Sequence, residues 1–242
     1  MNLDLLGLLS LPNWFIHISS SLEWGVAAFM MYRYGRITGR KDIRLFGLSM
    51  LPHWIGSFFV LAYHVTTDSV PLLLDMSETI NLFGSISLLW ATMQILKTSG
   101  TSNLASGMMA GFGTLMIAGK PQSYMGEDVF DAILQISSVV YLTFLVLLLK
   151  VRKKDPSVFS GLTVAGFWFV LVFISVTVFF MYMATEIREF HSLSHDDLLH
   201  GSAESLLTIS NLMIVIGIHR QTRQYEGLLK SGSGVQGRSI PE

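Results

Sequence analysis

A histidine and a glutamate lie one helical turn apart near the end of the chain. His200 and Glu204 occur in the stretch HDDLLHGSAESLLTISNLMIVIGIHR, where residues 198–218 are long and apolar enough to form a membrane-spanning helix. Ionisable groups are expensive inside a bilayer, so they usually face one another or a wet cavity. Imidazole and carboxylate together can bind a transition metal or relay protons, and a single histidine can ligate haem or chlorophyll.

Ionisable side chains also occur on the other apolar stretches. Most of them lie in the outer half of the helices, in the orientation that the basic residues indicate. Helical spacing also places His53, Ser57 and His64 on one face. We therefore predict a polar pocket in the outer leaflet, closed on the inner side by apolar sequence. The predicted cofactor-binding or pocket residues are His17, Glu23, His53, His64, Glu78, Glu186, His200, Glu204 and Asn211. The alternatives are solvation at the interface for the outermost residues and satisfied hydrogen bonds between helices for the deeper ones.

The spacing of these residues leaves the ligand open. Haem, chlorophyll, a carotenoid or a transition metal would each fit the residue types, and no catalytic residue or particular metal is indicated. The multi-histidine boxes of membrane desaturases are absent from the sequence. A retinal protein is disfavoured because Lys97 and Lys150 lie at the inner ends of their helices. The absence of cysteine excludes disulfides and cysteine-ligated iron–sulfur clusters.

The elements that must position these residues are membrane helices. Hydrophobic residues make up 51% of the 242-residue chain and charged residues only 14%. The apolar residues fall in continuous blocks of about 20, the length of a helix that crosses a bilayer. An all-α, polytopic helical membrane protein is therefore predicted. The strong spans are residues 14–34, 45–64, 72–97, 129–150, 162–187 and 198–219.

Basic residues orient these helices, because Lys and Arg concentrate on the cytoplasmic side of a membrane. The connection after the first span is rich in arginine, whereas residues 65–71 carry no basic residue, so the N-terminus is predicted outside. Six spans would then place the basic run from Lys150 to Lys154 outside. A seventh crossing by residues 98–119, which contain no charged residue and are long enough to span, places every loop on the expected side. Six spans with a re-entrant or interfacial segment at 98–119 are the alternative.

Seven spans divide the chain into two triplets that face the same way, a 3+1+3 arrangement of parallel repeats. Glu78 and Glu204 occupy matching places at the start of the third span of each triplet. The predicted domains are residues 1–97 for the first triplet, 98–128 for the linker span and loop, and 129–222 for the second triplet. Residues 223–242 are predicted to be a disordered tail.

Both triplets resemble families of unknown function. The first resembles the hypothetical chloroplast reading frame forty-nine-like proteins, three-span membrane proteins of cyanobacteria and chloroplasts. The matching residues are WFIHISS from Trp14, Glu23-Trp24, Tyr34-Gly35, MLPH from Met50 and Tyr63-His64. The second resembles a companion three-span domain from the same organisms. It is matched by DPS from Asp155, LHGSAE from Leu199, Leu207-Thr208 and Asn211, although a serine stands at position 202 where a second glycine is expected.

The resemblance implies a photosynthetic organism and a thylakoid membrane, with a lumenal N-terminus and a stromal or cytoplasmic C-terminus. We expect an accessory membrane protein that serves a photosynthetic complex by assembly, stabilisation or pigment and cofactor handling. Its expected partners are the lipid bilayer and subunits of such a complex, with no nucleic acid. The alternatives are a carrier of 3+1+3 type for a small solute, metal ion or protons, and an intramembrane enzyme acting on a quinone, carotenoid or tetrapyrrole.

Overall fold

The computed structural model describes residues 5–6, 9–99 and 124–236 of the chain. A short hairpin pairs β1 (Leu5–Leu6) with β2 (Leu9–Ser10) in antiparallel fashion, and the remaining regular structure in these residues is helical. The long helices are α1 (Leu11–Ile37), α2 (Lys41–Ser49), α3 (Leu51–Val65), α4 (Pro71–Thr98), α5 (Glu127–Lys154), α6 (Gly161–Tyr182) and α7 (Asp197–Gln236). A π-helical turn, Met183–Ile187, and a 3-10 turn, Leu193–His195, connect α6 to α7.

Local sequence signals account for several helix boundaries. Ser10 and Ser160 cap α1 and α6, each accepting a hydrogen bond from the amide three residues on. Pro52 separates α2 from α3, because proline lacks an amide hydrogen and clashes with the preceding turn of a helix. The Trp24 indole donates to the Met50 carbonyl at this break, at 2.9 Å. Because α2 and α3 continue one another, the second predicted span is a single crossing with a break.

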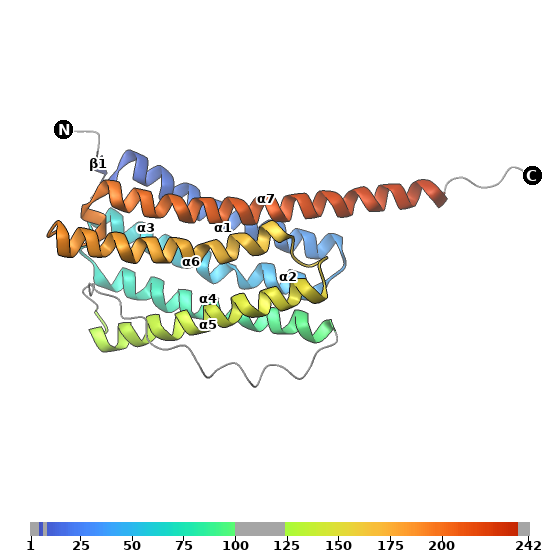
Figure 1. The fold of residues 1–242 in the computed structure, drawn as a ribbon, viewed down its shortest axis with the longest axis horizontal. Coiled ribbons are helices and arrows are strands. Elements are labelled where there is room, and N and C mark those ends of the chain that lie inside the picture. The colour runs from blue at the N-terminus through green and yellow to red at the C-terminus, as the bar shows by residue number, and fades with distance from the viewer. Residues whose placement is uncertain (1–4, 7–8, 100–123, 237–242) are drawn as a thin grey trace, which may run out of the picture.

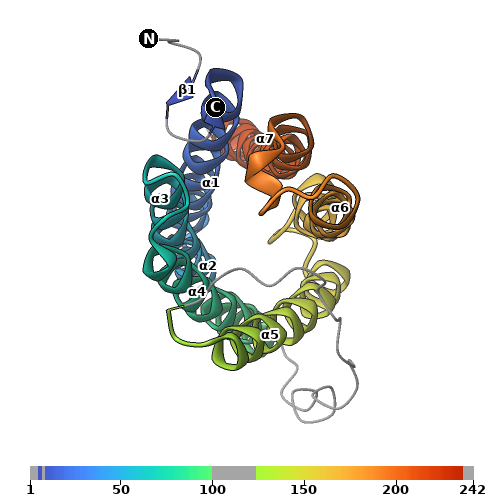
Figure 2. The same ribbon diagram turned by 90° about the vertical axis from the view of Figure 1, so that its left-hand side faces the viewer.

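The helices are arranged side by side around a ring. Seen from the end of the bundle that holds the start of α1, the order is α1, α3 with α2, α4, α5, α6 and α7, and α7 packs back against α1 (Figure 2). The helices α1 and α7 run in the same direction along the bundle, and α7 continues beyond the others toward the C-terminus (Figure 1). The N-terminal and C-terminal ends therefore lie at opposite ends of the bundle.

Five of the helices are long and apolar enough to cross a membrane. They are Lys41–Val65, Pro71–Thr98, Asp128–Lys154, Gly161–Ile187 and Asp197–Ser231. The helix α1 is not among them, although its 27 residues are enough to cross a bilayer, because polar side chains interrupt its apolar sequence. The prediction of an all-α membrane protein is confirmed for the described residues, whereas the count of seven spans stays a prediction.

The directions of α4 and α5 bear on that count. Asp75, near the start of α4, accepts hydrogen bonds from the amides of Tyr124 and Met125, just before α5 begins. The two helices start at the same end of the bundle and run in parallel (Figure 1). Apart from Thr98 and Ser99, the predicted linker span at 98–119 lies outside the described residues.

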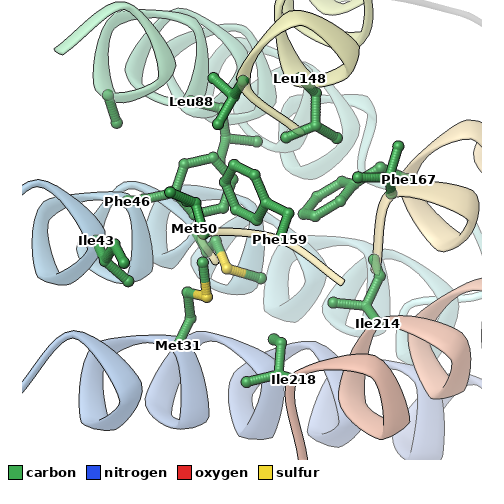
Figure 3. Close-up of a cluster of buried hydrophobic side chains, with 14 of the residues drawn as sticks. Met31, Ile43, Phe46, Met50, Leu88, Leu148, Phe159, Phe167, Ile214 and Ile218 are labelled. Atoms are coloured by element: carbon green, nitrogen blue, oxygen red, sulfur yellow. The ribbon is translucent and has the colours of Figure 1, made fainter. Parts of the chain in front are cut away.

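An apolar core joins the helices in the half of the bundle toward the C-terminal end. Phe46 of α2 packs against Phe159, which precedes α6, and against Phe167 of α6, with ring centroids 4.8 Å and 6.0 Å apart. Met31 of α1, Leu88 of α4 and Ile214 of α7 surround them (Figure 3). These fully buried side chains join α1, α2 and α4 to α6 and α7.

The C-terminal part differs from the sequence expectation at one point. A disordered tail is predicted from residue 223, but α7 continues without interruption to Gln236. The sequence of α7 after residue 220 is polar, as in a solvated disordered segment, and this composition led to the prediction of a disordered tail. The helix is extended there because it continues a long buried helix and needs no new nucleation.

Candidate functional site

Three buried histidines come together near the start of α1. His17 of α1, His64 of α3 and His200 of α7 each offer one ring nitrogen, and these atoms all lie within 4.8 Å of one another. The Nε2 atoms of His17 and His200 are 2.8 Å apart, and the ring centroids of the three pairs are 4.9 to 5.2 Å apart. The three side chains are only 5–7% exposed. The cluster unites residues that are more than 180 positions apart in the sequence.

Carboxylates lie behind two of these rings. Nδ1 of His64 is 2.8 Å from Oδ1 of Asp68, and Nδ1 of His17 is 3.8 Å from Oε2 of Glu204. In both residues, therefore, Nδ1 is turned to a carboxylate and Nε2 is left for the cluster. A carboxylate within hydrogen-bond distance, as Asp68 is of His64, fixes the tautomer and the orientation of a metal-binding imidazole.

Asp68 lies in the connection between α3 and α4 and is itself held in place. Ser194, in the turn before α7, donates a short hydrogen bond to its second oxygen, Oδ2. Burial alone would raise the pKa of Asp68, but hydrogen bonds from His64 and Ser194 outweigh that effect and lower the pKa below its ordinary value. The carboxyl group is therefore ionised at neutral pH.

Close packing of α1 on α7 brings His17 to His200. The Asn13 amide donates to the carboxylate and to the main-chain carbonyl of Asp197, at 2.6 and 2.8 Å. Gly201 lies directly against Asn13, and a Cβ atom at this position would overlap that side chain. The glycine thus allows the two helices to approach at the level of the histidines.

The other predicted pocket residues are placed differently. Asn211 is buried and donates to the carbonyl and hydroxyl oxygens of Ser20, both at 3.0 Å, so it joins α7 to α1 below the cluster. His53 packs over Gly84, with Nε2 3.3 Å from the Ser85 hydroxyl.

Three carboxylates of the predicted set do not belong to the histidine cluster. One oxygen of Glu23 is buried without a hydrogen-bond partner among the described residues. Glu78 is partly buried on α4, and Glu186 is exposed in the π-helical turn. The structure thus places His200 beside His64 and Glu204 near His17, whereas the cluster does not include Glu78 or Glu186.

The sequence prediction missed Asp68 and Ser194. Asp68 follows His64 by four residues, a spacing that brings two side chains together on a helix or at its end. That spacing was a usable signal for a paired carboxylate. Ser194 carried no such signal, because its contact with Asp68 spans 126 residues.

A different polar link occurs at the other end of the bundle. Arg40, before α2, contacts Asp42 at 2.6 Å and Asp155, after α5, at 2.7 Å. The hydrogen bonds that Arg40 donates to Asp42 and Asp155 raise the pKa of its guanidinium. Burial would raise the pKa of Asp155, but its hydrogen bonds with Ser157 and Arg40 lower it instead. This network joins the first triplet to the second away from the histidines.

The arrangement at the histidines suits a metal ion. Imidazole nitrogens are ligands for zinc, copper, iron and nickel, and three protein ligands leave a zinc ion a further position for water or substrate. The residues assembled here provide three such nitrogens together with oriented carboxylates.

Comparisons with known proteins find two families, each matching a different part of the chain. Residues 8–94 match the family described as protein of unknown function DUF2499, and residues 130–223 match protein of unknown function DUF3593. A Ycf49-like protein of Synechocystis sp. is 28% identical over 93 residues, which cover 38% of this chain and 89% of that protein. No solved structure matches the chain. The N-terminal part of the chain is thus similar to DUF2499 and to the cyanobacterial Ycf49-like protein, and the C-terminal part is similar to DUF3593.

Proposed function

We propose that this membrane protein binds a divalent transition-metal ion through His17, His64 and His200. The observation that carries the proposal is the convergence of three buried ring nitrogens within 4.8 Å. Burial of three imidazoles without a ligand would leave polar nitrogens in an apolar setting, which is unfavourable unless they are paired. A metal ion would pair all three at once.

A hydrogen bond between two neutral imidazoles would account for only part of this arrangement. It would satisfy the Nε2 atoms of His17 and His200, which are 2.8 Å apart. It gives no reason for His64 to be held against them by Asp68. The carboxylate behind His64 and the one near His17 favour metal binding, because second-shell carboxylates of this kind orient metal ligands.

Zinc is the first candidate among the metals. It accepts three imidazoles in a tetrahedral site and needs no redox partner. The site is shared between the two family regions, with His17 and His64 in the first and His200 in the second. The bound ion would therefore hold α1, α3 and α7 together at this end of the bundle.

The wider role we propose is that of an accessory protein in a thylakoid membrane, where the site serves the assembly or stability of a photosynthetic complex. The homologous cyanobacterial protein and the five candidate membrane helices support this role. With the N-terminus on the lumenal side, the histidines face the lumen and the basic connections face the stroma or cytoplasm. A carrier is less well supported, because large apolar side chains such as Phe46 and Phe167 fill the bundle beyond the site.

The test is metal analysis of the full-length protein, purified from membranes with an affinity tag that contains no histidine. We expect about one zinc ion per chain, and an absorption spectrum of tetrahedral cobalt after exchange with Co²⁺. The double variant His64→Gln/His200→Gln should lose both signals. The matched control is His191→Gln/His195→Gln, which removes two exposed histidines from the nearby connection.

Circular dichroism of each variant keeps loss of metal distinct from loss of the fold. Wild-type protein that stays metal-free and gives no cobalt spectrum after incubation with either ion would refute the proposal. Equal loss of metal in the control variant would also refute it, because metal would then be held by surface histidines. A coloured preparation with a haem or chlorophyll spectrum would also refute the proposal, because the histidines would then bind a pigment.

A further inference from the structure

A small cavity lies between α1 and α7 at the end of the bundle away from the histidines. Its volume is about 230 Å³, and it is lined by Met30 and Arg33 of α1 and by His219, Thr222, Arg223 and Glu226 of α7. These residues belong to the last third of α1 and to the second half of α7. None of these residues takes part in the metal site.

The charge of this cavity is positive. The Arg33 guanidinium contacts the Glu226 carboxylate at 3.2 Å, in an exposed ion pair. Arg223 adds a second guanidinium to the same cavity, and His219 adds an imidazole. Two arginines therefore face one carboxylate. The planar guanidinium group is well suited to bind phosphate or sulfonate oxygens through two parallel hydrogen bonds.

Exposed apolar stripes lead to this cavity along both helices. On α1 the stripe repeats every three or four residues and ends at Arg33; it consists of Phe15, Ile18, Leu22, Val26 and Phe29, all exposed. On α7 the stripe leads in the same way to His219 and Arg223, and it consists of Ile209, Leu212 and Ile216. In a membrane protein such stripes face the hydrocarbon chains of lipids.

We propose that this cavity is a binding site for an anionic membrane lipid. The phosphate or sulfonate of the headgroup binds to Arg33 and Arg223, and the acyl chains lie along the apolar stripes of α1 and α7. The position agrees with the basic side of the membrane, where clefts between helices take anionic headgroups. A free anion would use the arginines but not the stripes, so a lipid accounts for both features.

Glu226 gives the proposal a distinctive consequence. Its carboxylate occupies Arg33 and would repel the headgroup, so it should weaken lipid binding rather than support it. Removing the two arginines should lower the affinity for the anionic lipid, whereas removing the glutamate charge should raise it. A purely structural role of the ion pair would make both changes destabilising.

The experiment is native mass spectrometry of the full-length protein in detergent, with phosphatidylglycerol and phosphatidylcholine that carry the same acyl chains. The wild-type protein should retain phosphatidylglycerol in preference to phosphatidylcholine. Arg33→Gln/Arg223→Gln should lower that preference about thirty-fold, since each arginine near a membrane surface contributes a factor of roughly five to six. Glu226→Gln should increase it.

The matched control is Arg36→Gln/Arg220→Gln, which removes the same charge from exposed positions of the same two helices outside the cavity. It should keep the wild-type preference. Equal effects of the two double variants, absence of any preference in the wild type, or weaker binding in Glu226→Gln would each overturn the proposal. Displacement of the lipid by inorganic phosphate at a similar concentration would also overturn it, by showing that the site binds the free anion.

Discussion

Replacing Asp68 by asparagine should weaken zinc binding about 10- to 100-fold while leaving the fold intact. The Asp68 carboxylate accepts from His64 at 2.8 Å and is also bonded to Ser194, so it holds one proposed ligand from behind. Asparagine has the same shape and can still accept one hydrogen bond from His64. The change therefore removes the charge and little else.

The size of the effect follows from the kind of hydrogen bond that is lost. A hydrogen bond to a charged group contributes about 1.5–3 kcal/mol, against about 0.5–1.5 kcal/mol for a neutral one. The difference of about 1.4 kcal/mol corresponds to roughly tenfold in affinity. Weaker polarisation of the imidazole adds to this, which gives the upper part of the range.

The affinity is measured on the full-length protein by competition with a chromophoric zinc chelator, with the tag free of histidine. Asp128→Asn is the matched control, because it removes the same charge from an exposed position at the same end of the bundle. Thermal unfolding of the metal-free proteins checks that the fold is retained. Wild-type affinity in Asp68→Asn, with unchanged unfolding, would refute the idea that this carboxylate supports a metal ligand.

Two further predictions concern stability. A Cβ atom at Gly47 would lie 2.5 Å from the main-chain nitrogen of Tyr32, so Gly47→Ala should lower the free energy of unfolding by about 1–3 kcal/mol in thermal melts. Gly227→Ala, in open space on α7, should instead be stabilising, and equal effects would contradict the packing argument. Because the pKa of Asp155 is lowered in the folded state, its contribution is present above its ordinary pKa of 3.8 and is lost as the pH falls below that value. Melts between about pH 3 and pH 7 should thus show a smaller acid-induced loss of stability in Asp155→Asn, and an unchanged loss would contradict the role of its bond to Arg40.

The sequence was a good guide to helices and a partial guide to the site. The thickness of a bilayer sets the length of an apolar run, so the spans from α3 to α7 could be predicted from hydropathy alone. Ionisable residues stand out against such runs, which is why His17, His64, His200 and Glu204 could be predicted as pocket residues. The linker span at 98–119 stays a prediction, because it lies almost entirely outside the described residues.

Which of those residues meet is decided by the tertiary structure. Sequence gives the depth of a residue along its helix, but the neighbours of that helix and its rotation depend on packing between distant segments. The contact of Asn13 with Gly201 and the core around Phe46 set α1, α2 and α7 in place. That packing brings three histidines together and turns Glu186 outward. It also brings the connection holding Asp68 to the 3-10 turn before α7, a contact that no periodicity could reveal, because neither segment is part of an α-helix.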